Sequence, residues 1–297
     1  MPRGPYFRIA IVATLLFGAR TLAAQSASAQ NAIHDARANS PRTYLGFDVN
    51  EYPGDAALPA LRQTFAFAGY WLNVPPGAKT DNWTGKRAAF FKHGFGFLVL
   101  FNGRLDRELK SESNASALGA TDAAAAIAAA RREEFPAATI IFLDQEEGGR
   151  LLPEQMSYVL AWVDALTTSG FRAGIYCSGM PSKEGKSTII TANDIHGHEA
   201  QRKISYFVYN DACPPSPGCA YSQNPPSPAN SGVPFAAIWQ FAQSPRRRAF
   251  TRSCSASYNS DRNCYPPVNT ATGISKRNAA IYLDLDSATS ADPSSGR

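Results

Sequence analysis

The sequence lacks several features that would point to common functional classes. Its 297 residues include only four histidines and five cysteines. Neither the C-x-x-C pair of zinc ribbons nor the H-E-x-x-H pattern of zinc peptidases occurs, and "HGHE" at 196–199 has no third ligand in its pattern. The G-x-G-x-x-G turn of dinucleotide-binding domains is also missing. We therefore expect no metal and no other cofactor.

The chain carries little net charge. The formal charge is +5, and residues 1–29 hold three arginines and no acid, so the remainder has 5 − 3 = +2. A charge this small does not favour nucleic acid or an anionic membrane surface as a partner. We expect no nucleic-acid binding.

Long hydrophobic runs are absent after the N-terminus. The run at 9–18 follows Arg3 and Arg8, is too short to span a bilayer, and precedes "ASA" at 27–29. This order is typical of a secretory signal peptide. We expect a signal peptide at 1–29, a linker at 30–43, one domain at 44–290 and a tail at 291–297. The protein is then secreted, extracellular or periplasmic, without stable membrane insertion after cleavage.

The cysteines fit an oxidising compartment, where disulfides form. Two pairs are close in sequence, Cys213 with Cys219 and Cys254 with Cys264, whereas Cys177 ends an apolar run. We predict two local disulfides and a buried, unpaired Cys177. Spacing alone does not fix the connectivity.

Eight short apolar runs recur through the chain. They are "TYLGFDV", "FAGYWLN", "FGFLVLF", "TIIFLD", "FRAGIYC", "ISYFVYN", "FAAIWQF" and "AAIYLDL". Most are continuously apolar rather than alternating, which is typical of strands buried on both faces of a helix-covered parallel sheet.

Helical patterns separate the early runs. One begins at Thr121 or Asp122, and another spans 153–170, with shorter ones at 58–65 and 84–94. The segment 213–234 contains seven prolines, which exclude a long helix there. "GMPSKEGKST", from Gly179, has the wrong glycine spacing for a phosphate loop and is expected to be a solvent loop.

This alternation predicts an α/β fold, a (β/α)8 TIM-type barrel with reduced helices in its C-terminal part. The alternative is an open doubly wound sheet. That fold favours a glycine-rich phosphate turn after the first strand, but the first run continues "GFDVNEYPG".

Acidic residues cluster where the predicted strands end, which is where TIM barrels carry their active sites. Asp48 ends the first run, Asp144 and Glu146 follow the fourth, and Asp284 lies in the eighth. Asp144 and Glu146 are two apart, so they share one side of an extended chain. Glu147 points the other way and is expected to be a solvated loop acid.

Such carboxyls suit glycosidic bond cleavage, in which one protonates the leaving oxygen and another assists from the far side. Like charges close together raise the pKa of one member. The catalytic candidates are therefore Asp48, Asp144, Glu146 and Asp284. The substrate-binding candidates are Tyr52, Trp71, Tyr176, Trp239, Gln240 and Asp286. The competing interpretation is structural, with strand-end acids acting as caps and Trp71 and Trp239 packing in the core.

Several of these motifs resemble a known group of proteins. "YLGFDVNEY", "IIFLDQEEGG", "FRAGIYCSG", "AAIWQFAQ" and "IYLDLD" look like successive strands of family 25 glycoside hydrolases, which are secreted lysozyme-type barrels acting on peptidoglycan. The sequence resembles a related glycoside-hydrolase-like domain family, DUF1906, as closely as it resembles family 25, or more closely. This resemblance covers roughly residues 44–287.

The resemblance implies roles for individual residues. Asp48 matches the first-strand Asp, Asp144 and Glu146 match the Asp-x-Glu whose Glu is the general acid, and Asp284 matches the last-strand Asp. Trp239 and Gln240 match a Trp-Gln pair. The second run ends "YWLNVPPG" and the third ends "LFNGR". Both strand ends differ from those of the lysozymes, so we expect a substrate cleft of different shape.

We therefore expect a secreted glycoside-hydrolase-like protein that acts on cell-wall or extracellular glycan, with peptidoglycan as a candidate, by carboxylate general-acid catalysis. The alternative is a non-catalytic glycan-binding or envelope-associated barrel.

Overall fold

A computed structural model describes residues 42–210, 225–243, 264–265 and 281–297. The predicted signal peptide and most of the linker lie outside these residues. So do three of the cysteines of the two predicted disulfides, and the fourth, Cys264, is described only as part of a strand.

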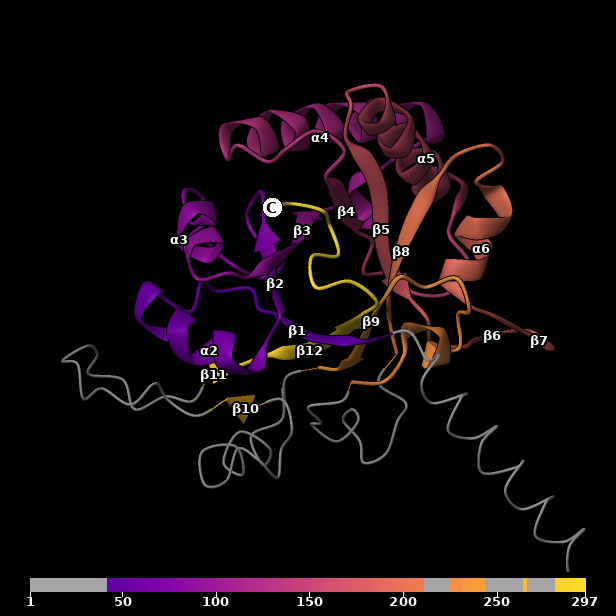
Figure 1. Ribbon diagram of the computed structural model, residues 1–297. Coiled ribbons are helices and arrows are strands. Elements are labelled where there is room, and N and C mark those ends of the chain that lie inside the picture. Colours follow the sequence, from indigo (N-terminus) through magenta and orange to yellow (C-terminus); the bar gives the residue numbers. More distant parts are fainter. Residues whose placement is uncertain (1–41, 211–224, 244–263, 266–280) are drawn as a thin grey trace, which may run out of the picture. The chain divides into compact units, whose positions relative to one another are not determined.

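Eight strands close into a barrel, in the order β1-β12-β9-β8-β5-β4-β3-β2 (Figure 1). Their bounds are β1 Tyr44–Asp48, β2 Phe67–Trp71, β3 Gly96–Asn102, β4 Ile140–Asp144, β5 Arg172–Ser178, β8 Ile204–Tyr209, β9 Ile238–Ala242 and β12 Asp284–Ala288. Seven of them coincide with predicted apolar runs, whereas β12 shares only Asp284 and Leu285 with the eighth run, whose Ile281–Tyr282 forms a separate strand, β11. The predicted barrel is confirmed and the open sheet is excluded.

The direction of the last strand differs from the prediction. β12 pairs antiparallel with both β1 and β9, whereas the other neighbours are parallel. Asp284, the first residue of β12, therefore lies opposite Asp48, the last residue of β1. A reversed strand presents its beginning at the end of the barrel where the parallel strands finish.

Helices cover the barrel mainly in its N-terminal half. They are α2 Leu58–Thr64, α3 Arg87–Lys92, α4 Glu112–Arg132, α5 Pro153–Thr167 and α6 Thr191–His198, with short 3-10 turns at Asp55–Ala57, Asp106–Glu108 and Pro228–Ser231. Among the described residues, the 3-10 turn Pro228–Ser231 is the only helical element after β8. This agrees with the prediction of reduced helices in the C-terminal part. None of the described helices is long and apolar enough to cross a membrane.

Helix α4 begins earlier than predicted. Ser111 caps it, its hydroxyl accepting a hydrogen bond from the Asn114 amide. Asp122 is therefore not a cap but lies inside the helix, where it binds Arg104 through two hydrogen bonds of 2.7 and 2.8 Å. Small residues let α4 and α5 approach closely, since a Cβ on Gly119 would lie 2.3 Å from the Tyr158 carbonyl oxygen. Figure 1 shows the two helices side by side.

The segment from Gly179 is a hairpin rather than a solvent loop. Strands β6 Ser182–Glu184 and β7 Ser187–Ile189 pair antiparallel around Gly185, whose φ of 59° suits the tight turn. A second two-stranded sheet joins β10 Cys264–Tyr265 and β11 Ile281–Tyr282.

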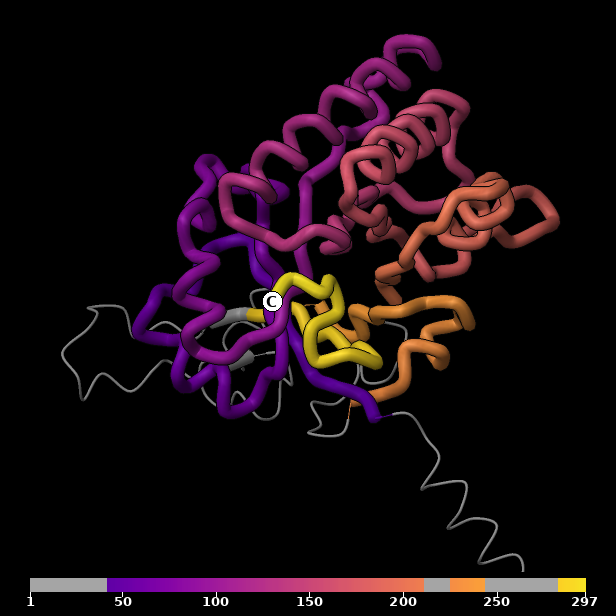
Figure 2. Tube along the Cα trace, turned by 45° about the horizontal axis from the view of Figure 1, so that its top comes forward, coloured from indigo at the N-terminus to yellow at the C-terminus, as the bar shows by residue number. Residues whose placement is uncertain are grey.

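Residues 291–297 pack against the beginnings of β3 and β4 (Figures 1 and 2). The Ser294 amide donates a hydrogen bond to the Phe97 carbonyl, and the Ser294 carbonyl accepts one from the Ile140 amide, both at 2.8 Å. A Cβ on Gly96 would lie 1.9 Å from the Ala291 carbonyl oxygen, so only glycine leaves room for this segment. The segment covers the end of the barrel opposite the acidic residues.

Cys177 is buried and unpaired, as predicted. Burial raises the pKa of its thiol, which makes it an inert core residue.

Candidate active site

An open cleft of about 400 Å³ lies where the parallel strands end. Its lining residues are Asp48, Asn50, Trp71, Pro76, Leu100, Asp144, Glu146, Tyr176, Phe207, Gln240, Gln243 and Asp284. Seven of them are sequence candidates, including all four proposed catalytic acids.

Gln240 holds the acids of β1 and β12 together. Its Nε2 donates to Asp48 Oδ2 at 2.8 Å and reaches Asp284 Oδ2 at 3.4 Å. Its Oε1 accepts from the Tyr176 hydroxyl at 2.8 Å. The amide is thereby oriented, with its donor side toward the carboxyls.

The buried carboxyls bind protons more tightly than ordinary ones. Burial, followed by the charge of Asp284, raises the pKa of Asp48 to about 8, although the Gln240 hydrogen bond opposes the shift. Burial also raises the pKa of Asp144, with further contributions from Glu146 and Asp48. Asp144 Oδ1 is buried without a hydrogen-bond partner. At neutral pH the cluster therefore retains protons.

Gly69 on β2 makes space for Asp48. A Cβ at this position would lie 2.6 Å from the Asp48 Cβ and 3.2 Å from Leu100 Cδ1. Any side chain here would displace the Asp48 carboxyl from its place beside Gln240.

Glu146 and Glu147 have different environments. Glu146 is exposed and lines the cleft with Asp144, as the two-residue spacing predicts. Glu147 points elsewhere and is not simply solvated. Its Oε2 accepts from the Asp106 amide at 2.8 Å and from Gln155 Nε2 at 2.6 Å. These bonds fasten the start of the loop to its neighbours.

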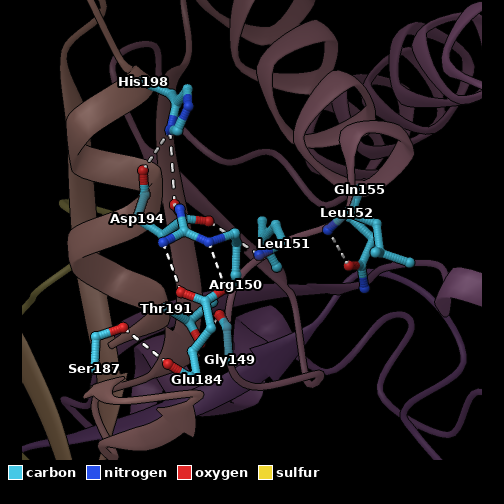
Figure 3. Close-up of polar contacts among 10 residues, drawn as sticks. All are labelled: Gly149, Arg150, Leu151, Leu152, Gln155, Glu184, Ser187, Thr191, Asp194 and His198. Atoms are coloured by element: carbon cyan, nitrogen blue, oxygen red, sulfur yellow. Dashed lines mark hydrogen bonds and ion pairs between the residues drawn. The ribbon is translucent and has the colours of Figure 1, made fainter. Parts of the chain in front are cut away.

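Arg150 fastens the other end of this loop (Figure 3). Its Nε and Nη2 donate to the two carboxylate oxygens of Glu184 at 2.7 and 2.8 Å, and Nη1 donates to Asp194 Oδ1 at 3.2 Å. The Leu151 amide donates to Asp194 Oδ2, and the Thr191 hydroxyl donates to the Gly149 carbonyl. The β6–β7 hairpin and α6 thus hold the segment that follows Glu146.

Three sequence candidates do not line the cleft. Tyr52 packs edge-on against Trp83, and its hydroxyl donates to Asp55. Trp239 is buried, and its Nε1 donates to the Asn210 carbonyl. Asp286 is fully buried two pairs deeper in the antiparallel register, opposite Gly46. Burial, followed by the charges of Asp48 and Asp284, raises its pKa well above the usual range.

Five lining residues were not among the candidates. Asn50 lies two residues after Asp48, just as Glu146 lies two residues after Asp144. The same alternation along an extended chain therefore predicts that Asn50 lines the cleft. Gln243 follows β9, and its Nε2 reaches Gln240 Oε1 at 3.4 Å. Pro76, Leu100 and Phe207 carry no chemical signal that separates them from core residues.

In the described part of the chain, no three His, Cys, Asp or Glu side chains are arranged to hold a metal ion. His196 stacks on Phe235, and His198 Nδ1 lies 2.7 Å from the Asp194 carbonyl oxygen.

The raised pKa of Asp48 predicts a pH-dependent stability. Between pH about 4 and 8 the unfolded chain loses this proton and the folded chain keeps it. The free energy of unfolding therefore decreases with rising pH by about 1.4 kcal/mol per unit for this proton. Asp48→Asn should remove the effect, so the variant should gain stability relative to wild type as pH rises through this window. Urea unfolding from pH 4 to 9 measures the difference, with exposed Asp106→Asn as control. A pH-independent difference would contradict the assignment.

The described residues thus form a closed barrel with carboxyls gathered where its parallel strands end. Residues 77–210 match the model of the Rv2525c-like, glycoside hydrolase-like domain family, which confirms the resemblance drawn from the strand motifs.

Solved structures of low sequence identity are similar to this chain. An uncharacterized B. stearothermophilus protein is 17% identical, with a TM-score of 0.50, and the match covers 82% of this chain and 94% of that one. The Clostridium perfringens spore cortex lytic enzyme SleM is 13% identical with a TM-score of 0.49, covering 85% and 69% of the two chains. The Mycobacterium tuberculosis Tat-secreted protein Rv2525c is 11% identical with a TM-score of 0.43, covering 83% and 95%. No curated protein matched the chain.

Proposed function

We propose that this protein is a secreted glycoside hydrolase that cleaves a cell-wall or extracellular glycan by carboxylate general-acid catalysis. The observation that carries the proposal is the meeting of Asp48, Asp144, Glu146 and Asp284 in one open cleft. The match to a glycoside hydrolase-like family model supports it. The signal-peptide pattern at 1–29 supports export.

Glu146 is the proton donor in this mechanism because it is the exposed member of the cluster. A donor must come within hydrogen-bond reach of the glycosidic oxygen, and Asp144 Oδ1 is sealed from solvent.

Asp48 and Asp284 serve the opposite role. They lie across the cleft on β1 and β12, and Gln240 orients them. An ionised carboxylate there stabilises the positive charge that develops on the sugar or activates the attacking water. Trp71, Tyr176 and Phe207 supply apolar surface on which a sugar ring can rest.

The test is release of reducing ends from glycans offered to the purified protein. Peptidoglycan, chitin oligomers and neutral β-linked glucans cover the main classes, and wild type should release reducing ends from at least one of them. If it binds a glycan but releases no ends, the alternative applies, namely a non-catalytic glycan-binding barrel.

A further inference from the structure

The cleft contains a buried amide whose orientation matters for the acids beside it. Gln240 lies on β9 within hydrogen-bonding distance of Asp48 and Asp284. A carboxamide has a donor end and an acceptor end, and a half-turn about its last side-chain bond exchanges the two. Depending on that half-turn, the two acids face either a hydrogen-bond donor or another acceptor.

Only one of the two orientations satisfies the neighbours of this amide. Gln240 Nε2 faces Asp48 Oδ2 at 2.8 Å and Asp284 Oδ2 at 3.4 Å. Gln240 Oε1 faces two donors, the Tyr176 hydroxyl at 2.8 Å and Gln243 Nε2 at 3.4 Å. The reversed amide would place its oxygen against the carboxyl oxygens and its NH₂ group against that of Gln243. Both contacts join like ends, so the donors on Oε1 hold the amide as it stands.

Of these two donors, the tyrosine hydroxyl is the stronger constraint. Its 2.8 Å bond has the usual length for O–H···O, whereas 3.4 Å from Gln243 is beyond the usual range for N–H···O. The Tyr176 ring is held against Phe207, with ring centroids 4.6 Å apart, and its backbone pairs with Asp144 of β4 and Phe207 of β8. Gln243 is half-buried beyond the end of β9.

The tyrosine hydroxyl stays a donor while the carboxyls titrate. Burial, followed by the charge of Asp144, raises the pKa of Tyr176 well above its usual value. The hydroxyl therefore keeps its proton throughout the pH range in which carboxyls ionise, and its hydrogen bond to Gln240 does not depend on pH there.

We propose that the Tyr176 hydroxyl is a positioning group that acts through Gln240 and keeps the donor end of the amide on Asp48 and Asp284. The sequence indicated substrate binding for this tyrosine, but its hydroxyl is already engaged within the protein, and its ring remains part of the cleft wall. The proposal rests on the proposed function only for its kinetic consequence, because the hydrogen bonds exist whether or not a glycan is cleaved.

Loss of the hydroxyl should make Asp48 harder to ionise. Burial and the charge of Asp284 raise the pKa of Asp48 to about 8, and the hydrogen bond from Gln240 opposes them. The described cleft lining includes no lysine, arginine or histidine, so the amide donor is important for the ionised form. The other titratable groups around Asp48 are Asp284 and Asp286 of β12, Asp144 of β4, Tyr176 of β5 and Glu146.

The first test measures proton binding by Asp48 without any substrate. Asp48→Asn gains stability over its parent as pH rises, and the gain stops growing once the folded carboxyl ionises, near pH 8 in the wild type. Introducing Tyr176→Phe into both chains should move this endpoint upward by about one pH unit, as the loss of a hydrogen bond to a charged group implies. Urea unfolding over the range pH 6 to 10 measures the endpoint.

Tyr158→Phe is the matched control. It removes the hydroxyl of another buried tyrosine, which donates to Asp122 at 2.9 Å and does not line the cleft. The endpoint should stay near pH 8 in this background. An unchanged endpoint in Tyr176→Phe overturns the proposal, and so does an equal shift in both tyrosine variants.

A further background shows whether the hydroxyl acts through the amide. In chains that carry Gln240→Met, Tyr176→Phe should produce no additional shift, because the group that connects the hydroxyl to Asp48 is gone. A shift that persists in this background means that the hydroxyl acts on Asp48 directly, which contradicts the proposal. Thermal unfolding confirms that each variant is folded.

The second test uses turnover. The proposed role of Asp48 needs its ionised form, so Tyr176→Phe should lower kcat/KM about tenfold well below pH 8, and the loss should disappear as pH rises past the new endpoint. A loosened structure would instead lower kcat/KM equally at every pH. Tyr158→Phe should keep the pH profile of wild type.

The two proposals can fail separately. A shifted endpoint in Tyr176→Phe, without release of reducing ends by wild type from any glycan, rejects the hydrolase and leaves the positioning role. An active wild type whose endpoint and pH profile are both unchanged by Tyr176→Phe rejects the positioning role and leaves the hydrolase.

Discussion

Glu146→Gln should lower the rate of reducing-end release by roughly 10²–10⁴-fold, the usual loss when a positioned proton donor is removed. The change keeps the size of the side chain and its hydrogen-bonding capacity, so glycan binding should remain close to that of wild type. The loss should therefore appear in kcat rather than in KM. Initial rates over a range of glycan concentrations separate the two.

Glu51→Gln is the matched control, because the same chemical change is made at an exposed acid outside the cleft. Its kcat should stay within a few-fold of wild type. An active wild type whose Glu146→Gln variant keeps full turnover would falsify the assignment of the donor, and Asp144 would then be the next carboxyl to test.

Trp162→Ala should lower the free energy of unfolding by about 3–5 kcal/mol, as removal of a fully buried tryptophan usually does. Trp162 lies on α5 and packs against Phe101 of β3, with ring centroids 5.1 Å apart. The substitution leaves a cavity between α5 and β3, and the surrounding structure relaxes only partly around such a cavity. Urea denaturation followed by circular dichroism measures the change.

Trp162→Phe distinguishes packing from hydrogen bonding. The Trp162 Nε1 group is buried without a partner, so its removal eliminates an unsatisfied donor. The phenylalanine variant should therefore lose much less stability than the alanine variant. If the two lose equally, the indole nitrogen has a role that the packing does not explain.

The sequence predicts most of the barrel strands well because they are largely apolar, and burial on both faces requires that composition. It does not predict the position or direction of β12, because this strand, DLDSA, begins where the eighth apolar run ends and its composition is the same in a parallel and an antiparallel pair. The start of α4 was misplaced for a different reason. Asp122 resembles a cap, but Arg104 and Tyr158 satisfy it inside the helix.

The positions of the candidate residues follow the same logic. Alternation along an extended chain correctly places Asp144 and Glu146 on one side. It also implies that Trp239 and Gln240, as neighbours, cannot both face the cleft. The depth of Asp286 depends on strand direction, since reversal puts Asp284 at the rim and Asp286 inside. Tyr52 lies beyond the end of β1, where strand periodicity no longer applies.

The segment at 291–297 and strand β12 also affect how the chain folds. Asp292 Oδ1 accepts a hydrogen bond from the Phe97 amide, 195 positions away, and β12 is the strand between β1 and β9. Contacts of such long sequence separation form late and slow folding, because the chain must first lose the entropy of closing a large loop. A ribosome-bound chain that lacks β12 has an open sheet with two unpaired edges. The barrel therefore closes only after β12 has been synthesised.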